Sequence, residues 1–125
     1  MSNENEQINL HLVQYLKKIL IDWDLSLQQL AKISHVSEDI LKNYLELTLS
    51  QLDELPSIPS GLDPAMPLVS IYKNLKQMLP VQEKLNEWLA SPHELFDGNK
   101  PIEVMGMSPQ HLAWVSYTLE SKARG

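Results

Sequence analysis

Apolar residues recur at helical spacing through most of this chain, and this periodicity restricts the fold more than any other feature. Within residues 8–23, 68–79 and 112–119, apolar side chains fall three or four positions apart, with polar side chains between them. This spacing places the apolar residues on one face of an amphipathic helix. A further helix is expected over residues 81–90, with Val81 at the start of its inward face. No segment alternates apolar and polar residues as a half-buried strand does, so the sequence predicts an all-α protein.

Three serines mark predicted helix starts. Ser26 and Ser37 each precede a short run with helical spacing, and Ser108 is followed by Pro109, which suits the first position of a helix. A serine hydroxyl at this place accepts a hydrogen bond from a backbone N–H that has no partner inside the helix. We therefore expect helices to begin just after each of these serines.

The segment at residues 56–64, PSIPSGLDP, is the one convincing linker in the chain. At its end, Asp63 and Pro64 fit the N-cap and the first position of the next helix. We therefore expect two helical subdomains that share a core, one over residues 8–60 and one over residues 61–125.

The charge distribution argues against strong binding to nucleic acid. The chain has a net charge of −6, and residues 1–60 contain 4 lysines against 9 acidic residues. Arg124 is the only arginine, so the N-terminal half has no guanidinium with which to recognise guanine. Proteins that bind nucleic acid usually carry a basic patch, because neutralising phosphates supplies most of their affinity. The negative charge of the N-terminal half is therefore unfavourable for binding to DNA.

The sequence also lacks the usual elements of an active site. It has no cysteine, which excludes a disulfide, a thiolate metal site and a cysteine nucleophile. None of the four histidines pairs with another at i, i+4, and the glycines form no phosphate-binding loop. The first residues are acidic and polar, unlike a signal peptide, and no apolar stretch is long enough to span a bilayer. We expect a cytoplasmic protein that is not an enzyme, with no cofactor and no metal site.

The spacing of a helix-turn-helix appears in the N-terminal half. Ala31 is small enough for two helices to cross closely, Val36 fills the corner after the turn, and Leu41 faces back from the second helix. Residues 10–55 therefore resemble the Xre/Cro family of DNA-binding domains. His35 stands where that family usually has glycine in a left-handed turn, a conformation that histidine tolerates better than β-branched residues do.

This first resemblance implies a set of DNA contacts. The outward residues of the second helix would read bases, and nearby lysines would contact phosphates. The implied residues are Ser37, Lys42, Asn43, Lys32, Lys17 and Lys18. Glu38 and Asp39 would face the same groove and repel phosphate.

The segment WLASPHELFDGNKPIEVM carries the most specific pattern. A Trp-Leu pair ends a predicted helix, a proline follows four residues after the tryptophan, and an apolar residue precedes a glycine-bearing turn. A second proline then opens a short apolar stretch. The positions are Trp88, Leu89, Pro92, Phe96, Gly98, Pro101, Ile102, Val104 and Met105. With the last helix they resemble the toxin-binding domain of Xre/MbcA/ParS-type antitoxins over residues 65–125, although Ser108 stands where the family usually has threonine.

The second resemblance implies an antitoxin of a type II toxin–antitoxin system. Its C-terminal region would bind and block a RES-domain toxin, a class that acts on NAD, and its N-terminal module would bind operator DNA and repress the operon. The residues expected at a toxin or dimer interface are Trp114, Tyr117, His93, Phe96, Lys100 and Arg124. Trp114 and Tyr117 lie off the inward face of the last helix, so they are either interface anchors or covered by the N-terminal subdomain. Trp88 is expected to pack beneath the loop over residues 92–101.

Two other functions remain open at this point. One is a stand-alone Xre-like transcriptional regulator whose C-terminal half serves for oligomerisation. The other is an acidic adaptor that binds a protein partner and uses the helix-turn-helix only as a scaffold, which the charge distribution favours. In each case apolar faces this wide predict self-association, at least to a dimer.

Overall fold

The computed structural model describes residues 12–47, residue 51 and residues 61–124. The helices of this part are α2 (Leu12–Asp22), α3 (Leu27–Ser34), α4 (Glu38–Leu45), α6 (Met66–Met78), α7 (Gln82–Leu89), α8 (Pro101–Met105) and α9 (Pro109–Arg124), with 3-10 turns η1 (Asp63–Ala65) and η2 (Glu94–Phe96). No strand occurs among the described residues, where one isolated antiparallel bridge joins His93 to Asn99. The predicted all-α class is confirmed. None of the helices described is long and apolar enough to cross a membrane.

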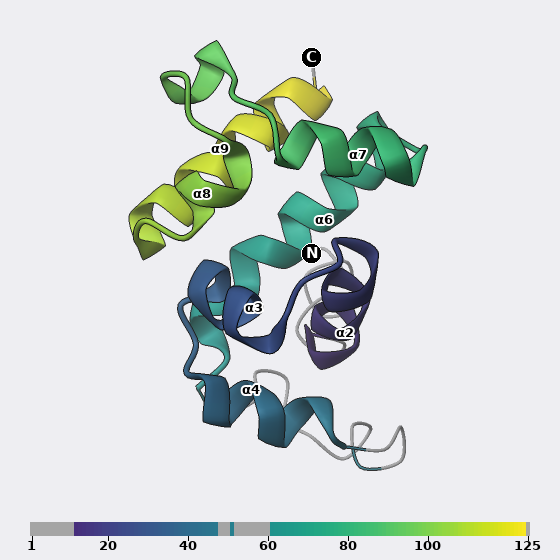
Figure 1. Ribbon diagram of the computed structural model, residues 1–125, viewed down its shortest axis with the longest axis vertical. Coiled ribbons are helices and arrows are strands. Elements are labelled where there is room, and N and C mark those ends of the chain that lie inside the picture. Colours follow the sequence, from purple (N-terminus) through teal and green to yellow (C-terminus); the bar gives the residue numbers. More distant parts are fainter. Residues whose placement is uncertain (1–11, 48–50, 52–60, 125) are drawn as a thin grey trace.

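Helix α6 lies at the centre of the molecule (Figure 1). It packs against α2 from the N-terminal half and against α7 and α9 from the C-terminal half. The short helix α8 packs on α9 and also contacts α3, so two segments far apart in the sequence lie side by side. The last helix therefore has one face against α6 and α8, and this arrangement determines which of its residues remain exposed.

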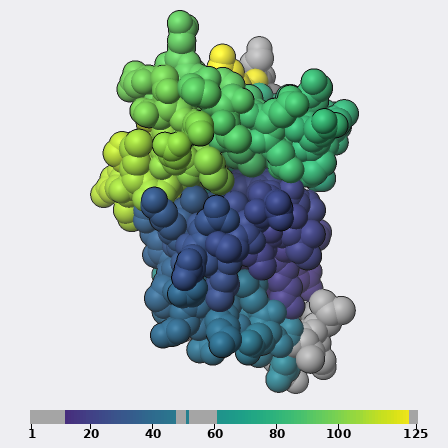
Figure 2. All heavy atoms as spheres, viewed as in Figure 1, coloured from purple at the N-terminus to yellow at the C-terminus, as the bar shows by residue number. Residues whose placement is uncertain are grey.

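Apolar residues from both halves of the chain form one hydrophobic core. Its fully buried members include Leu12 and Leu16 of α2, Leu68 of α6, and Leu112 and Val115 of α9. Burying a side chain of this size contributes about 1.5–3 kcal/mol. In Figure 2 the purple and blue N-terminal region lies directly against the green and yellow-green C-terminal region. The contact between the halves is therefore part of the core.

The three serines predicted as caps all make the expected hydrogen bonds. The Ser26 hydroxyl accepts from the backbone N–H of Gln29 at 3.1 Å, and the Gln29 side chain accepts from the Ser26 N–H at 2.8 Å. Ser37 and Ser108 accept from the backbone N–H three residues further on, at 3.3 and 3.1 Å. Each bond satisfies a donor that the helix itself leaves without a partner, so the sequence located these helix starts correctly.

Two other predicted positions are wrong. Asp63 is not an N-cap, because no side-chain hydrogen bond caps η1, and α6 begins only at Met66. The full burial of Leu62 and Ala65 holds this segment in place instead. Val81 is 58% exposed and does not face inward. It precedes α7 in an extended conformation, to which helical spacing does not apply.

Some predictions lie outside the described residues. They include the start of the first helix at residues 8–11 and the linker prolines at positions 56 and 59. The suggestion of another helical turn over residues 48–55 is also outside, apart from Gln51, which is helical.

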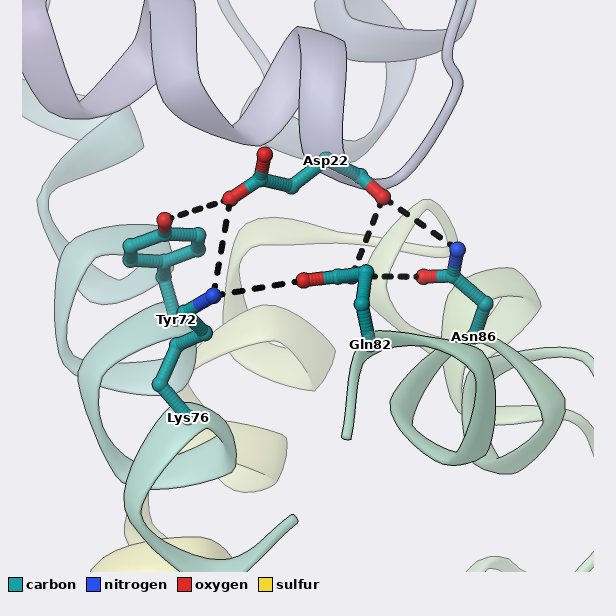
Figure 3. Close-up of polar contacts among 5 residues, drawn as sticks. All are labelled: Asp22, Tyr72, Lys76, Gln82 and Asn86. Atoms are coloured by element: carbon teal, nitrogen blue, oxygen red, sulfur yellow. Dashed lines mark hydrogen bonds and ion pairs between the residues drawn. The ribbon is translucent and has the colours of Figure 1, made fainter. Parts of the chain in front are cut away.

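A polar cluster at the C-terminal end of α2 ties this helix to α6 and α7 (Figure 3). The Asp22 carboxylate accepts a hydrogen bond from the Tyr72 hydroxyl at 2.6 Å and lies 3.9 Å from Lys76 Nζ. The Asp22 backbone carbonyl accepts from Gln82 Nε2 at 3.0 Å and from Asn86 Nδ2 at 3.2 Å. Carbonyls in the last turn of a helix have no partner within it, so α7 supplies the missing donors. The cluster thereby fixes α6 and α7 relative to α2.

Candidate docking surface

The last helix, α9, presents two aromatic residues to solvent. Its apolar residues Leu112, Val115 and Leu119 are buried in the core, as their spacing predicted. Trp114 and Tyr117 lie outside this buried face and are 38% and 70% exposed. The sequence left open whether the N-terminal half covers Trp114 and Tyr117. The described residues of that half do not cover either side chain.

The exposed Trp114 ring rests on a buried one. Phe96, at the end of η2, is 0% exposed, and its ring meets that of Trp114 edge-to-face at 5.3 Å between centroids. Trp88 of α7 contacts the Phe96 ring in the same manner at 6.1 Å. The prediction that Phe96 is itself an interface contact is wrong, because a fully buried side chain offers no surface to a partner. The buried Phe96 ring packs against the inner side of the Trp114 ring.

The turn that carries Phe96 is held to α7 by His93. The His93 ring stacks on Trp88 at 5.1 Å between centroids, and its Nε2 lies 3.0 Å from the Trp88 backbone oxygen. The backbone N–H of Gly98 donates to the His93 carbonyl at 2.9 Å, and Gly98 has a φ of 82°, which favours glycine. Trp88 therefore packs against the loop over residues 92–101, as predicted. His93, predicted as an interface residue, uses its ring and its Nε2 within the chain.

An open, largely apolar groove of about 570 Å³ lies beside Trp114. Its lining comes from α9 and from the turn that carries η2. The lining residues are Leu95, Trp114, Tyr117, Thr118, Ser121 and Lys122. Leu95 is 43% exposed, so three large apolar side chains meet solvent here. We call this set of six residues the α9 groove.

The sequence identified only two of the six groove residues. Thr118 and Lys122 follow Trp114 at i+4 and i+8, and Ser121 follows Tyr117 at i+4, so helical spacing from the two aromatics places them on the same side. Leu95 comes from another element, and no local pattern points to it. Lys100, predicted at the interface, is exposed but pairs with Glu103 at 3.9 Å and does not line the groove. The side chain of Arg124 lies outside the described part.

In the N-terminal half, α3 and α4 are joined by a short turn in which His35 adopts the left-handed conformation, with φ 60° and ψ 32°. This is the conformation that the sequence predicted for His35. Val36, within the turn, and Leu41, in α4 after it, are buried, also as expected. The assignment of α3 and α4 to a DNA-binding module remains a prediction.

The residues predicted to contact bases lie on α4. Lys42 and Asn43 are exposed, and so are Glu38 and Asp39 in the first turn of the same helix. The Ser37 hydroxyl caps α4 by accepting from a backbone N–H, so that oxygen is already engaged. The surface of α4 therefore combines two residues suited to DNA with two that oppose it.

Two of the three lysines predicted to contact phosphates place their ammonium groups against the protein. Lys17 is half-buried, and its Nζ donates to the Leu47 backbone oxygen at 3.0 Å, which ties α2 to the end of α4. Lys18 Nζ lies 5.2 Å from the centroid of the Tyr15 ring. Lys32 is exposed, and the stem of its side chain lies close to Gly106. The ammonium group of Lys17 is therefore directed to the protein in the free chain, and its role as a phosphate contact remains a prediction.

A metal centre has no basis in the described residues, where no three histidine, aspartate or glutamate side chains are grouped to hold an ion. Comparison with known proteins does not place the chain in a family. No family model matches it, and no curated protein is significantly similar in sequence.

Proposed function

We propose that this chain is an antitoxin that neutralises a RES-domain toxin by direct binding, with the α9 groove as the docking surface. The observation that carries the proposal is the half-exposed Trp114 ring supported by the buried Phe96 ring. Neutralisation would be stoichiometric, because it depends on covering a surface of the toxin. The chain would perform no chemistry of its own.

The physical properties of the α9 groove suit a protein partner. Trp114, Tyr117 and Leu95 remain exposed although they are large and apolar, a combination typical of binding hot spots. Because Phe96 holds the Trp114 ring in place, little side-chain freedom is lost when a partner covers it. Rigid aromatic anchors of this kind contribute a large share of the free energy of binding in many interfaces.

The choice of partner rests on the sequence resemblance. The pattern that runs from Trp88 to Met105 covers the residues that support the groove from behind, including Phe96 and the turn at Gly98. If the resemblance holds, this chain presents the same kind of surface as those antitoxins do. This supports the choice of a RES-domain toxin over an unrelated partner.

Autorepression of the operon is the second part of the proposal. It is supported by the left-handed His35 between α3 and α4 and by the exposure of Lys42 and Asn43. The charge of the chain and the exposed Glu38 and Asp39 favour instead an adaptor that does not bind DNA. A stand-alone regulator would bind DNA and use the α9 groove for a second copy of itself.

The toxin proposal is tested by adding the purified chain to a purified RES-domain toxin encoded in the same genome and measuring NAD loss. We expect the chain to stop NAD loss at a one-to-one ratio. Trp114→Ala should weaken inhibition at least tenfold, because removing a hot spot costs about 2 kcal/mol or more. The matched control is Gln110→Ala, which changes an exposed α9 residue outside the groove. Undiminished NAD loss with the unchanged chain would overturn the proposal.

DNA binding is tested with a promoter fragment at low salt. If α4 reads the operator, affinity should fall steeply as salt rises, and Lys42→Ala with Asn43→Ala should abolish specific binding. Gln28→Ala, on the exposed side of α3, is the control. Affinity that survives both α4 changes would show that α4 is not the recognition helix, and absence of binding at low salt would favour the adaptor.

A further inference from the structure

The side chain of His35 joins the α3–α4 turn to the end of α8. His35 Nε2 lies 2.8 Å from the backbone carbonyl oxygen of Met105, although the two residues are 70 positions apart in the sequence. A carbonyl oxygen can only accept a hydrogen bond, so Nε2 must carry a proton. The contact is therefore incompatible with the tautomer protonated at Nδ1 alone.

Helix α8 needs such a partner because it is only five residues long and ends at Met105. The backbone N–H of Gly106 donates to the carbonyls of Glu103 and Val104, and that of Met107 donates to Val104 again. None of these bonds satisfies the Met105 carbonyl, which is one of the last carbonyls of the helix. The His35 imidazole supplies a donor there.

A second contact brings the same two segments together. A Cβ atom added to Gly106 would lie 3.2 Å from Lys32 Cγ, so the stem of Lys32 passes directly over the end of α8. The side chain of Met105 is fully buried as well. The last turn of α3 and the last turn of α8 are thus packed through both a hydrogen bond and a close aliphatic contact.

We infer that His35 is a latch that couples the α3–α4 turn to α8. In this position histidine does what glycine does in such turns, since it adopts a left-handed backbone, and it also holds α8 through its side chain. Because α8 packs on α9, the latch links the turn between α3 and α4, through α8, with the helix that supplies five of the six residues of the α9 groove. His35 acts as a positioning residue for both segments. This inference concerns the chain alone and stands whether or not a toxin or DNA is bound.

The latch makes a direct prediction for the unchanged protein. Nitrogen-15 NMR of the full chain should show His35 in the tautomer protonated at Nε2, with one slowly exchanging ring proton. Observation of the tautomer protonated at Nδ1, or of rapid averaging between the two, would overturn the inference. This measurement needs no variant and so does not depend on a variant that folds.

The coupling is tested with His35→Gly, which allows the positive φ of this turn and removes the imidazole. Loss of one hydrogen bond of ordinary strength should speed amide hydrogen exchange about fivefold at both ends of the latch. The amides to follow are those of Leu41 in α4 and of Gly106 and Met107 after α8. If exchange rises in α4 and stays unchanged after α8, the two segments are not coupled and the inference fails.

The matched control is Asp24→Gly. Asp24 also has a left-handed backbone, with φ 52°, and it is exposed at the end of α2. The substitution changes backbone freedom as His35→Gly does and leaves α8 untouched. We expect no change in exchange at Gly106 or Met107. An equal effect from both variants would mean that backbone freedom, and not the imidazole, explains the result, and would overturn the latch.

Discussion

The ring of Phe96 meets the ring of Trp114 edge-to-face, with an interplanar angle of 83° and 5.3 Å between centroids. One of the two rings is fully buried and the other is 38% exposed. Aromatic pairs in this geometry are worth about 0.5–1.5 kcal/mol beyond the area they bury. An exposed side chain is therefore held in position by the core, and changes in the core should alter the surface above it.

The first prediction tests this dependence with Phe96→Leu. Removing the ring should lower the free energy of unfolding by about 1–3 kcal/mol, because the smaller side chain leaves part of the site empty. It should also increase the mobility of the Trp114 indole, as measured by relaxation of its Nε1–H resonance in NMR. The control is Tyr117→Ala, which removes a side chain that is 70% exposed. There we expect a change within about 0.5 kcal/mol and an unchanged indole.

The second prediction concerns Trp23, which is 6% exposed. Its Nε1–H is buried and has no hydrogen-bond partner in the described part of the chain. An unsatisfied buried donor costs about 1–3 kcal/mol. Trp23→Phe removes this donor and keeps an aromatic ring near Tyr72, whose centroid lies 6.4 Å away. The free energy gained by removing the unsatisfied donor should offset the packing lost with the smaller side chain.

We therefore expect Trp23→Phe to change the free energy of unfolding by less than about 1 kcal/mol in urea denaturation. Truncating a buried tryptophan to alanine usually costs about 3–5 kcal/mol, so Trp23→Ala is the reference for the lost packing. A loss above about 2 kcal/mol for Trp23→Phe would show that the indole N–H contributes a hydrogen bond in solution.

Features that depend on residues close in sequence were predictable, and features that depend on the tertiary arrangement were not. The caps at Ser26 and Ser108 and the buried face of α9 follow from spacing within one helix, so the sequence was sufficient. The prediction that Val81 faces inward was wrong because its backbone is extended just before α7 begins. Periodicity describes a helix only where the helix exists.

The residues of the candidate site likewise include some that spacing within one helix predicted and others that depend on how the helices pack. Trp114 and Tyr117 were predicted because they fall outside the apolar face of one helix. The burial of Phe96 depends on where α7 and α9 meet, which no local pattern encodes. The contact of His35 with Met105 spans 70 positions, and without related sequences nothing in the chain links the two residues.

The third prediction is the pH dependence of Tyr72. Burial of the phenol, and then its hydrogen bond to the Asp22 carboxylate, raise the pKa of Tyr72 well above its usual value of about 10. The folded state holds this proton more tightly than the unfolded state does. The contribution of Tyr72 to the free energy of unfolding is therefore fully present below about pH 10 and is lost as the pH rises further. Tyr72 should not ionise before the chain unfolds.

This is measured by following tyrosinate absorbance and helicity together during an alkaline titration. Tyr72→Phe should lose about 1 kcal/mol at neutral pH, because the hydrogen bond to Asp22 is removed. Above about pH 10 the free energy of unfolding of this variant should fall less steeply than that of the unchanged chain. Parallel curves for the two proteins would contradict the assignment of the raised pKa to Tyr72.

The fourth prediction concerns the cap of α9. The Ser108 hydroxyl accepts from the backbone N–H of His111 and also lies 2.7 Å from His111 Nδ1. The ring of His111 in turn lies 6.2 Å from that of Trp114, so the cap fixes the turn that adjoins the docking surface. Ser108→Ala should therefore lower the free energy of unfolding by about 0.5–2 kcal/mol and weaken protection of the Leu112 amide in hydrogen exchange.

Ser108→Thr is the matched control for the cap. Threonine keeps the hydroxyl that accepts the backbone hydrogen bond, and it is also a favourable N-cap residue. We expect its free energy of unfolding to stay within about 0.5 kcal/mol of that of the unchanged chain, and the Leu112 amide to remain protected. If alanine and threonine have the same effect, the hydroxyl does not stabilise α9, and the first turn must be held by the packing of Leu112 alone. If only alanine loosens that turn and also weakens partner binding, the cap acts on the docking surface through His111 and Trp114.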